Sequence, residues 1–233
     1  MPMTRSIKAH WEEIYAVGDA DSVSWFQSDP TPSLDLIATA GVAPDAAILD
    51  VGGGASLLVD RLLDRGFSAL SVLDVSGQAL AMTKARLGPR AASVCWVEAD
   101  ATAWEPPAGE FRLWHDRAVF HFLTEAADRD AYLRSLNHGL RPGGFALFGA
   151  FALDGPERCS GLEVRRYSAA TLQATLGPAF ELVVERSETH ITPTGGGQNF
   201  VWGLYRKFGQ GRSGSAEVLT APRHGQRVGQ KIA

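Results

Sequence analysis

An apolar strand that runs directly into three consecutive glycines is the feature that most constrains this chain. Residues 47–51 read Ala-Ile-Leu-Asp-Val, and Gly52, Gly53 and Gly54 follow them. Glycines lack Cβ, so the backbone here can turn sharply and pass close beneath a bound ligand. A second apolar run, residues 70–74, ends in Asp74, 20 residues after Gly54. Together the two segments predict an α/β domain that binds a nucleoside cofactor.

The charges around the glycines discriminate between nucleoside cofactors. A dinucleotide fingerprint, Gly-x-Gly-x-x-Gly, needs a third glycine where this chain has Leu57. Asp50 would repel phosphates but suits a cationic ligand with an amino group. Asp74 is placed to accept hydrogen bonds from both ribose hydroxyls. S-adenosylmethionine fits both acids. The alternative, an NAD-dependent oxidoreductase, would need a downstream catalytic set such as Tyr/Lys, and we find no such spacing.

These segments carry a resemblance to a known family. Residues 50–56 resemble motif I of class I S-adenosylmethionine-dependent methyltransferases, Asp/Glu-x-Gly-x-Gly-x-Gly, with Ser56 in place of the last glycine. Asp74 is similar to the acid after the family's second strand, and residues 98–102 to the turn after its third strand, which reads adenine. The resemblance covers about residues 7 to 207. It implies S-adenosyl-L-methionine as cofactor, bound by Trp11, Tyr15, Trp25, Asp50, Gly52, Gly53, Gly54, Asp74, Val75, Asp100, Ala101 and His115.

Apolar runs and helical segments alternate along the chain. Such alternation predicts a parallel sheet with right-handed crossovers and ligands at the carboxyl ends of the strands. The expected strands are 47–51, 69–74, 92–97, 111–115, 144–152, 180–185 and 199–206. The expected helices are 10–17, 32–40, 55–65, 76–87, 126–139 and 168–176. With the family resemblance, this order predicts a Rossmann-like, seven-stranded, mostly parallel sheet with helices on both faces and a C-terminal antiparallel hairpin.

The chain divides into three parts. We expect residues 1–45 to form an N-terminal cap and first helix, and residues 46–208 to form the cofactor-binding methyltransferase core. Residues 209–233 are rich in glycine and poor in apolar side chains, so we expect a flexible tail.

Composition excludes several classes of function. The 233 residues are 45% hydrophobic and 21% charged, enough for a sizeable core. A net charge of −4 argues against a nucleic-acid partner, and no apolar stretch reaches the roughly 20 residues that span a bilayer. With no signal core after Met1 we expect a cytoplasmic enzyme. Cys95 and Cys159 are expected as reduced thiols, Cys159 as a small loop residue, and no metal site is expected. Oligomeric state is left open.

A cluster of titratable residues ends the fourth expected strand. We place His115, Asp116 and Arg117 near the reaction centre, with His121 as a further catalytic candidate. In the family, this place borders the methionine moiety and the substrate. The alternatives are structural, because Asp116 and Arg117 can pair to fix the turn and His121 can be a hydrogen-bonded core residue.

Within the family, the residues around Asp116 resemble two groups. They are similar to the Trp-Asp-Arg-Gly of thiopurine and related thiol S-methyltransferases, which implies a small-molecule acceptor. They are also similar to the Asp-Lys-Gly of some protein-lysine methyltransferases, which is the alternative. The loop 154–167 resembles a thiol-group loop in position but carries Arg165 and Arg166, which are expected either to bind an anion or to be solvated. A non-catalytic cofactor-binding domain is the third alternative.

Overall fold

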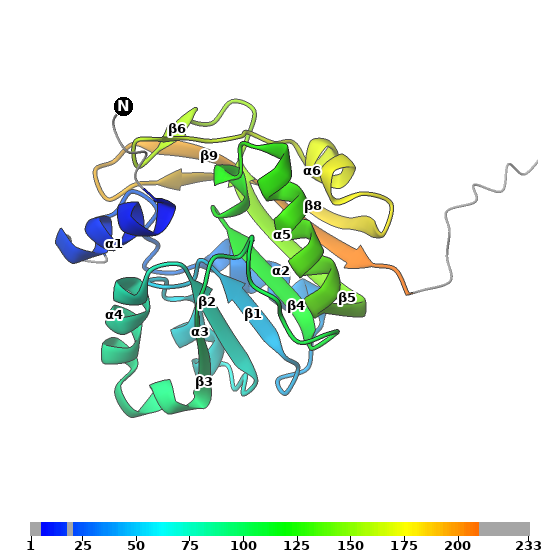
Figure 1. Ribbon diagram of the computed structural model, residues 1–233, viewed down its shortest axis with the longest axis horizontal. Helices are drawn as coiled ribbons and strands as arrows, with labels where there is room; N and C mark the ends of the chain where they lie inside the picture. The colour runs from blue at the N-terminus through cyan, green and yellow to red at the C-terminus, as the bar shows by residue number, and fades with distance from the viewer. Residues whose placement is uncertain (1–5, 18–20, 210–233) are drawn as a thin grey trace, which may run out of the picture.

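The computed structural model describes residues 6–17 and 21–209, so the tail expected over residues 209–233 lies outside the described residues except for Gly209. A seven-stranded sheet runs through the centre of the molecule (Figure 1). Its strands are β1 (Ile48–Val51), β2 (Leu70–Asp74), β3 (Val94–Glu98), β4 (Phe111–Arg117), β5 (Leu140–Phe151), β8 (Phe180–Ile191) and β9 (Gly197–Lys207).

The order of the strands is β3-β2-β1-β4-β5-β9-β8. The first five are parallel to one another, and β9 pairs antiparallel with both β5 and β8. The order reverses between β1 and β4, and a sheet of this type binds its ligands beyond the carboxyl ends of the strands at that point. The predicted fold class, including the C-terminal antiparallel hairpin, is confirmed.

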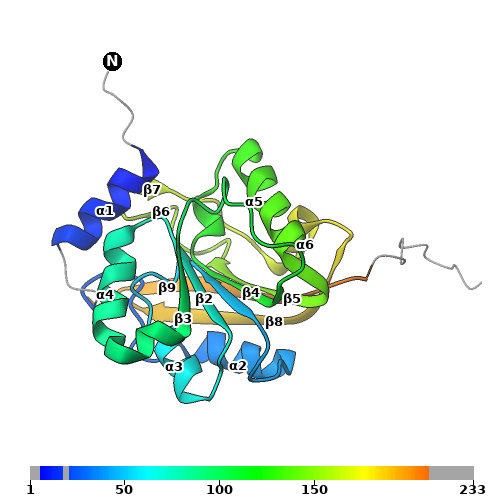
Figure 2. The same cartoon turned by 60° about the horizontal axis from the view of Figure 1, so that its bottom comes forward.

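Helices cover both faces of the sheet (Figure 2). Alternate residues of the strands face opposite sides, so Ile48 packs in one core cluster and Leu49 in the other. The first cluster includes side chains of α2 (Thr31–Ala40), α3 (Leu58–Asp64) and α4 (Gly77–Leu87). The second includes those of α5 (Ala126–Gly139) and α6 (Ala169–Leu176). The remaining helical elements are α1 (Ile7–Val17), η1 (Gly88–Ser93) and η2 (Phe120–Phe122).

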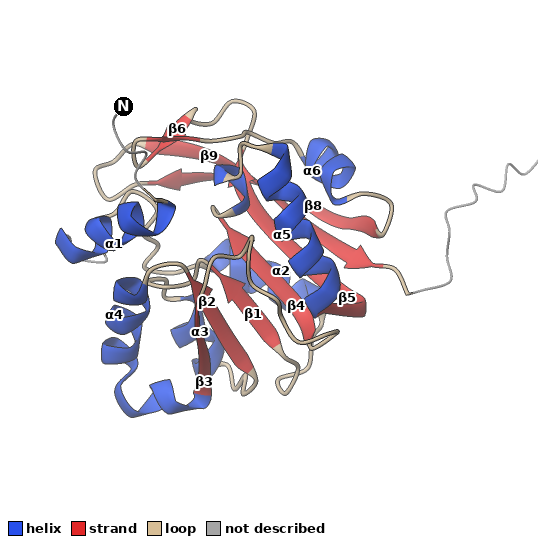
Figure 3. Ribbon diagram, viewed as in Figure 1, coloured by secondary structure: helices blue, strands red, loops and turns tan. Residues whose placement is uncertain are grey.

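The structure corrects several expected element bounds (Figure 3). Strand β5 begins at Leu140 and not at residue 144, and β8 continues to Ile191 and not to residue 185. Residues expected as a glycine-rich loop contain a short antiparallel pair, β6 (Arg158–Cys159) and β7 (Leu162–Glu163). The sequence pattern did not predict the full length of β8, because β8 is half exposed. It did not predict β6 and β7, because each is only two residues long. Helix α5 has the predicted bounds.

Candidate active site

Two adjoining cavities lie beyond the carboxyl ends of the central strands. The larger has a volume of about 300 Å³ and the smaller about 50 Å³. Both are lined by Tyr15, Trp25, Val51, Gly52 and Arg117. The larger cavity continues past β2 and β3, and the smaller extends beneath the glycine loop. Together they form one cleft at the position where the strand order reverses.

The three glycines allow the backbone to pass between neighbouring side chains. Gly52 has a φ of +69°, and a Cβ there would lie 2.1 Å from Val119. A Cβ on Gly53 would lie 2.3 Å from Asp50 Oδ2, and one on Gly54 would lie 2.5 Å from Asp74 Oδ2. No side chain fits at any of the three positions without a shift of its surroundings. The three glycines are therefore required by the close packing of Val119, Asp50 and Asp74 against the loop, and the approach of this backbone to a ligand stays a prediction.

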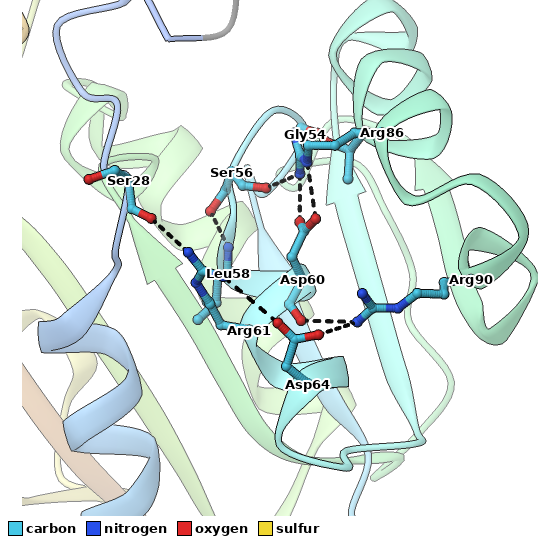
Figure 4. Close-up of polar contacts among 10 residues, drawn as sticks. Ser28, Gly54, Ser56, Leu58, Asp60, Arg61, Asp64, Arg86 and Arg90 are labelled. Atoms are coloured by element: carbon cyan, nitrogen blue, oxygen red, sulfur yellow. Dashed lines mark hydrogen bonds and ion pairs between the residues drawn. The ribbon is translucent and has the colours of Figure 1, made fainter.

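Ser56, which replaces the last glycine of the family motif, lies at the end of the glycine loop. Its hydroxyl accepts a hydrogen bond from Leu58 N–H at 3.0 Å, at the start of α3. Its carbonyl oxygen accepts from Arg86 Nη2 at 2.7 Å, and the same guanidinium pairs with Asp60 (Figure 4). From α3, Arg61 Nη2 donates to the Ser28 carbonyl oxygen at 3.2 Å. The loop is thus joined to α4, and α3 to the segment before α2.

Asp74 lies at the end of β2 with both carboxylate oxygens against backbone N–H groups. Oδ2 accepts from Gly54 N–H at 3.0 Å, and Oδ1 accepts from Ser76 N–H at 2.8 Å. Burial raises the pKa of Asp74 to about 6, although these two hydrogen bonds oppose the shift. Each oxygen keeps a second lone pair, and Asp74 and Val75 line the larger cavity. The carboxylate can therefore accept hydrogen bonds from ribose hydroxyls.

Asp100 follows β3 and lines the same cavity beside Ala101. Its Oδ1 accepts from the Thr102 N–H at 2.8 Å and from the Thr102 hydroxyl at 2.7 Å. These contacts fix the turn and leave Oδ2 for a ligand. The carboxylate is placed to accept from an exocyclic amino group such as that of adenine.

Asp50, His115 and Ser33 form a buried chain of hydrogen bonds. Asp50 Oδ1 lies 2.7 Å from His115 Nδ1, and His115 Nε2 lies 2.9 Å from the Ser33 hydroxyl. Because a carboxylate only accepts, His115 Nδ1 carries the proton. Asp50 Oδ2 is buried without a partner among the described residues. All three side chains line the smaller cavity, so His115 lies behind Asp50 and not in the larger cavity.

Asp116 holds the turn after β4 and lines neither cavity. It accepts hydrogen bonds from the N–H groups of Val119 and Phe120 and, at 2.6 Å, from the Tyr132 hydroxyl. Burial raises the pKa of Asp116 to about 6, against these hydrogen bonds. This geometry favours positioning of the turn. The structural alternative of an Asp116–Arg117 pair is absent among the interactions of the described residues.

Arg117 lines both cavities, which agrees with its predicted position near the reaction centre. Its Nη1 donates to the Trp25 carbonyl oxygen at 2.8 Å, and its guanidinium lies 4.9 Å from the centre of the Phe200 ring. Burial lowers the pKa of Arg117 to about 10, so the group stays charged at neutral pH.

His121 is a buried core residue. Its ring packs against Phe122 and Phe151, and its Nδ1 accepts from Phe151 N–H at 3.4 Å. Burial, with a smaller contribution from Arg117, lowers the pKa of His121 to about 3. The imidazole lines neither cavity and is neutral at pH 7, which favours the structural alternative.

Helix α1 forms the cap expected over the cleft. Trp11 packs edge-on against Trp25 and Phe122, with ring centres 5.6 and 5.1 Å apart, and Tyr15 lies 6.2 Å from Trp25. Glu12 accepts from the N–H groups of Gly77 and Gln78 and from the Ser76 hydroxyl, at the start of α4, where a carboxylate is favoured by the helix dipole. Lys8 pairs with Glu98 at the end of β3. In Figures 1 and 2 the cap lies beside α4.

Most of the predicted site residues therefore meet in the cleft. Gly54 supports it through Asp74, while Asp116 and His121 stand behind its walls. Neither Arg165 nor Arg166 lines a cavity; Arg165 is exposed and Arg166 pairs with Glu157. Sequence reasoning missed further lining residues, among them Ile7, Ser33, Phe122, Leu123, Asp128, Tyr132 and Cys159.

Cys159 is the clearest correction. It was expected as a small loop residue, but it lies in β6, is buried, and lines the larger cavity. Both cysteines are free thiols, as expected. No sequence signal around Cys159 marks the strand, because its partner β7 is only two residues long.

Comparison with known proteins identifies the core of this arrangement. Residues 48–144 match the family model described as a methyltransferase domain. This match covers less than half of the 233 residues. The chain is 30% identical over 112 residues to the ubiquinone/menaquinone biosynthesis C-methyltransferase UbiE of Shewanella oneidensis, a match that covers 46% of this chain and 43% of that protein. The chain thus matches less than half the length of this curated relative.

Solved structures support the fold over a longer range. A structure from work on the conversion of a disulfide bond into a thioacetal group during echinomycin biosynthesis has a TM-score of 0.71, with 17% identity, 87% of this chain and 93% of that chain covered. The 1,6-didemethyltoxoflavin-N1-methyltransferase of Burkholderia thailandensis, with bound S-adenosylhomocysteine, has a TM-score of 0.62, with 21% identity over 84% of this chain and 82% of that chain. At these identities the solved structures show that the fold is shared.

Two expected absences concern metals and membranes. Within residues 6–17 and 21–209, no three His, Cys, Asp or Glu side chains are grouped as metal ligands. In the same ranges no helix has the length and apolarity needed to cross a bilayer.

Proposed function

We propose that the protein transfers the methyl group of S-adenosylmethionine to a small nucleophile, a thiol or a similar acceptor, in an SN2 reaction. The observation that supports this most is the placement of three acids around one glycine loop. Asp50, Asp74 and Asp100 lie at the ends of β1, β2 and β3, where they fit the amino group, the ribose and the adenine of this cofactor. The remaining cleft wall, from Arg117 to Phe122, is left for the acceptor.

The cofactor supplies a methyl group on a good leaving group, so the protein's own contribution is alignment and exclusion of water. Positioning of two reactants is worth up to roughly 7 to 11 kcal/mol of the barrier. The aromatic side chains of the cap cover the cleft, and Arg117 sets a positive charge at its acceptor end. That charge favours an acceptor that reacts as an anion, such as a thiolate.

The placement of the titratable groups supports a thiol-like acceptor over a lysine, because His115 lines only the smaller cavity, where it bonds to Asp50, and Asp74 and Asp100 in the larger cavity fit the cofactor. His121, with a pKa of about 3, and Asp116, bound to the turn, both lie outside the cavities. No histidine or lysine lines the larger cavity within the described residues. A thiol with a pKa of about 8.5 ionises far more readily than a lysine amine with a pKa of about 10.4.

Methyl-labelled S-adenosylmethionine, incubated with panels of thiols, amines and carboxylates and with whole-cell protein extract, tests the proposal. Mass spectrometry separates labelled small products from labelled polypeptides, and Asp74→Ala is the negative control. A labelled thiol or similar small product supports the proposal. A labelled polypeptide alone would replace it with the lysine alternative, and cofactor binding without any transfer would replace it with the non-catalytic domain.

A further inference from the structure

Strand β8 forms one edge of the central sheet, beyond β9 (Figure 2). It is 12 residues long, whereas β3 at the opposite edge has five residues. Within the described part of the chain, β8 pairs only with β9, and its backbone from residue 182 to residue 191 makes no hydrogen bond on the outer side. A long edge strand with free N–H and C=O groups is a template for pairing with another chain.

Alternate residues of β8 direct their backbone groups outward. In the turn after β8, Thr192 N–H donates to the Gly196 carbonyl oxygen at 2.8 Å, so every second residue before Thr192 bonds to β9 and the residues between them point away from it. The β9 side agrees, because the carbonyl oxygen of Asn199, the partner of Thr189, accepts from the N–H of Ala152, directly after β5, at 2.9 Å. Outward N–H and C=O groups therefore belong to residues 185, 187, 189 and 191.

A second copy of β8 fits this edge in one antiparallel register. With a two-fold axis at Ser187, Arg186 of each chain lies opposite Glu188 of the other. The same axis places Val183 opposite Ile191 of the other chain. These two apolar side chains are 48% and 61% exposed. The strand is thus complementary to itself in charge and in apolar surface.

Other positions of the axis lose this complementarity. An axis at Glu185, Arg186 or Glu188 sets that residue opposite its own copy, so that like charges face each other. An axis at Thr189 leaves both apolar side chains opposite polar or turn residues. Only the axis at Ser187 pairs the opposite charges and the apolar side chains at once.

Both charged side chains keep the capacity for this contact. Arg186 forms an exposed ion pair with Asp35, and its side chain is 43% exposed. Glu188 accepts one hydrogen bond on each carboxylate oxygen, from Gln27 and from Trp202, so each oxygen keeps a lone pair. A bulge between Leu182 and Val184 ends the regular strand, which limits the pairing to residues 183–191.

We propose that two copies of the protein pair through β8 in an antiparallel, two-fold symmetric contact centred on Ser187. The contact joins the two sheets into one and makes each β8 an internal strand, which removes the free edge. The proposal goes beyond the proposed methyl transfer and does not depend on it, since none of residues 183–191 lines the cleft.

Sedimentation velocity on the full chain, over a dilution series, tests the dimer. Ser187→Pro removes an outward N–H that β9 does not use, so the fold should be kept while the dimer should weaken by at least about tenfold, because two hydrogen bonds across the axis are lost. Ile191→Lys should weaken the dimer by a similar factor, because an apolar contact is lost twice. Leu153→Lys, at a 59% exposed position outside β8, is the matched control and should leave the dimer unchanged.

Disulfide formation tests the register. In a Cys95→Ser background, which removes the exposed native thiol, Ser187→Cys places two thiols across the axis, where the Cα atoms of an antiparallel pair lie about 5.5 Å apart. Thr189→Cys places its two Cα atoms roughly 14 Å apart, too far for a disulfide. Mild oxidation should therefore give a covalent dimer with Ser187→Cys and none with Thr189→Cys.

Three results would overturn the proposal. The first is a wild type that stays monomeric up to about 1 mM and so has no dissociation constant below that value. The second is a dimer that survives both Ser187→Pro and Ile191→Lys, with circular dichroism showing that both variants are folded. The third is a covalent dimer that forms through Thr189→Cys in preference to Ser187→Cys.

Discussion

The two ends of the cleft are built in different ways. At the end formed by β1, β2 and β3, Asp74 and Asp100 accept from Ser76 and Thr102, two positions along the chain, while the other oxygen of Asp74 accepts from Gly54. Asp50, at the same end, is held by His115 from β4. At the acceptor end, Arg117 reaches the Trp25 carbonyl 92 residues away and lies over Phe200. The first end is preorganised in part by local turns; the second depends on distant segments and leaves buried donors unpartnered among the described residues. Cofactor binding is thus a property of the domain, whereas acceptor choice depends on the arrangement of the whole chain.

A substitution in the glycine loop should reduce cofactor binding more than any other change to the cleft. Gly53→Ala places a Cβ 2.3 Å from Asp50 Oδ2 and 3.1 Å from Val72, so we expect loss of S-adenosylhomocysteine binding below detection by calorimetry. Gly197→Ala is the matched control, because its Cβ meets only an ordinary contact at 3.5 Å. A Gly53→Ala protein that binds the nucleoside normally would show that the loop does not need its close approach.

The ribose contact should give the next largest effect. Asp74→Ala removes the acceptor of two ribose hydroxyls, each worth about 1.5–3 kcal/mol to a charged group, so we expect at least about a 100-fold weaker affinity for S-adenosylhomocysteine. Asp130→Ala, an exposed acid of α5, serves as control. The measurement is again calorimetry, accompanied by thermal unfolding to verify folding. Less than a threefold change would remove Asp74 from the cofactor site.

The raised pKa of Asp74, about 6, predicts how cofactor affinity changes with pH. Below that pKa the carboxyl is protonated and donates, while above it the carboxylate accepts from both hydroxyls. Affinity for S-adenosylhomocysteine should therefore rise by about tenfold from pH 5 to pH 7. Asp74→Asn should remove this dependence, and Asp116→Asn should not, although Asp116 has a similar pKa. A slope retained in Asp74→Asn would assign it to another group.

The chain of Asp50, His115 and Ser33 lies beside the smaller cavity, and its loss should affect stability more than binding. His115→Phe leaves Asp50 buried without the one hydrogen bond that it makes among the described residues, and should lower the free energy of unfolding by about 3 kcal/mol. Ser33→Ala should lower it by only about 1 kcal/mol, since Ser33 contacts the far side of the ring. Denaturant unfolding measures both. Equal effects would contradict a role for His115 in holding Asp50.

The contrast between the two ends of the cleft explains which site residues the sequence could predict. Asp50, the glycines and Asp74 follow apolar strands at fixed spacing, so their meeting at one sheet edge follows from the topology of parallel strands. The burial of His121 and the use of Asp116 within its own turn depend on packing against Phe151 and Tyr132, which periodicity does not encode. Cys159 reaches the cavity only because a two-residue strand pairs with another. Spacing predicted the cofactor end, whereas long-range packing decided the acceptor end.

The central claim is that the acids around this glycine loop favour the binding of S-adenosylmethionine, a cationic methyl donor, over the binding of a dinucleotide. Calorimetric titration of the wild-type protein with S-adenosylhomocysteine and, separately, with NADH tests it most directly. We predict saturable one-to-one binding of S-adenosylhomocysteine and no measurable heat with NADH. Saturable binding of NADH, with none of S-adenosylhomocysteine, would contradict it.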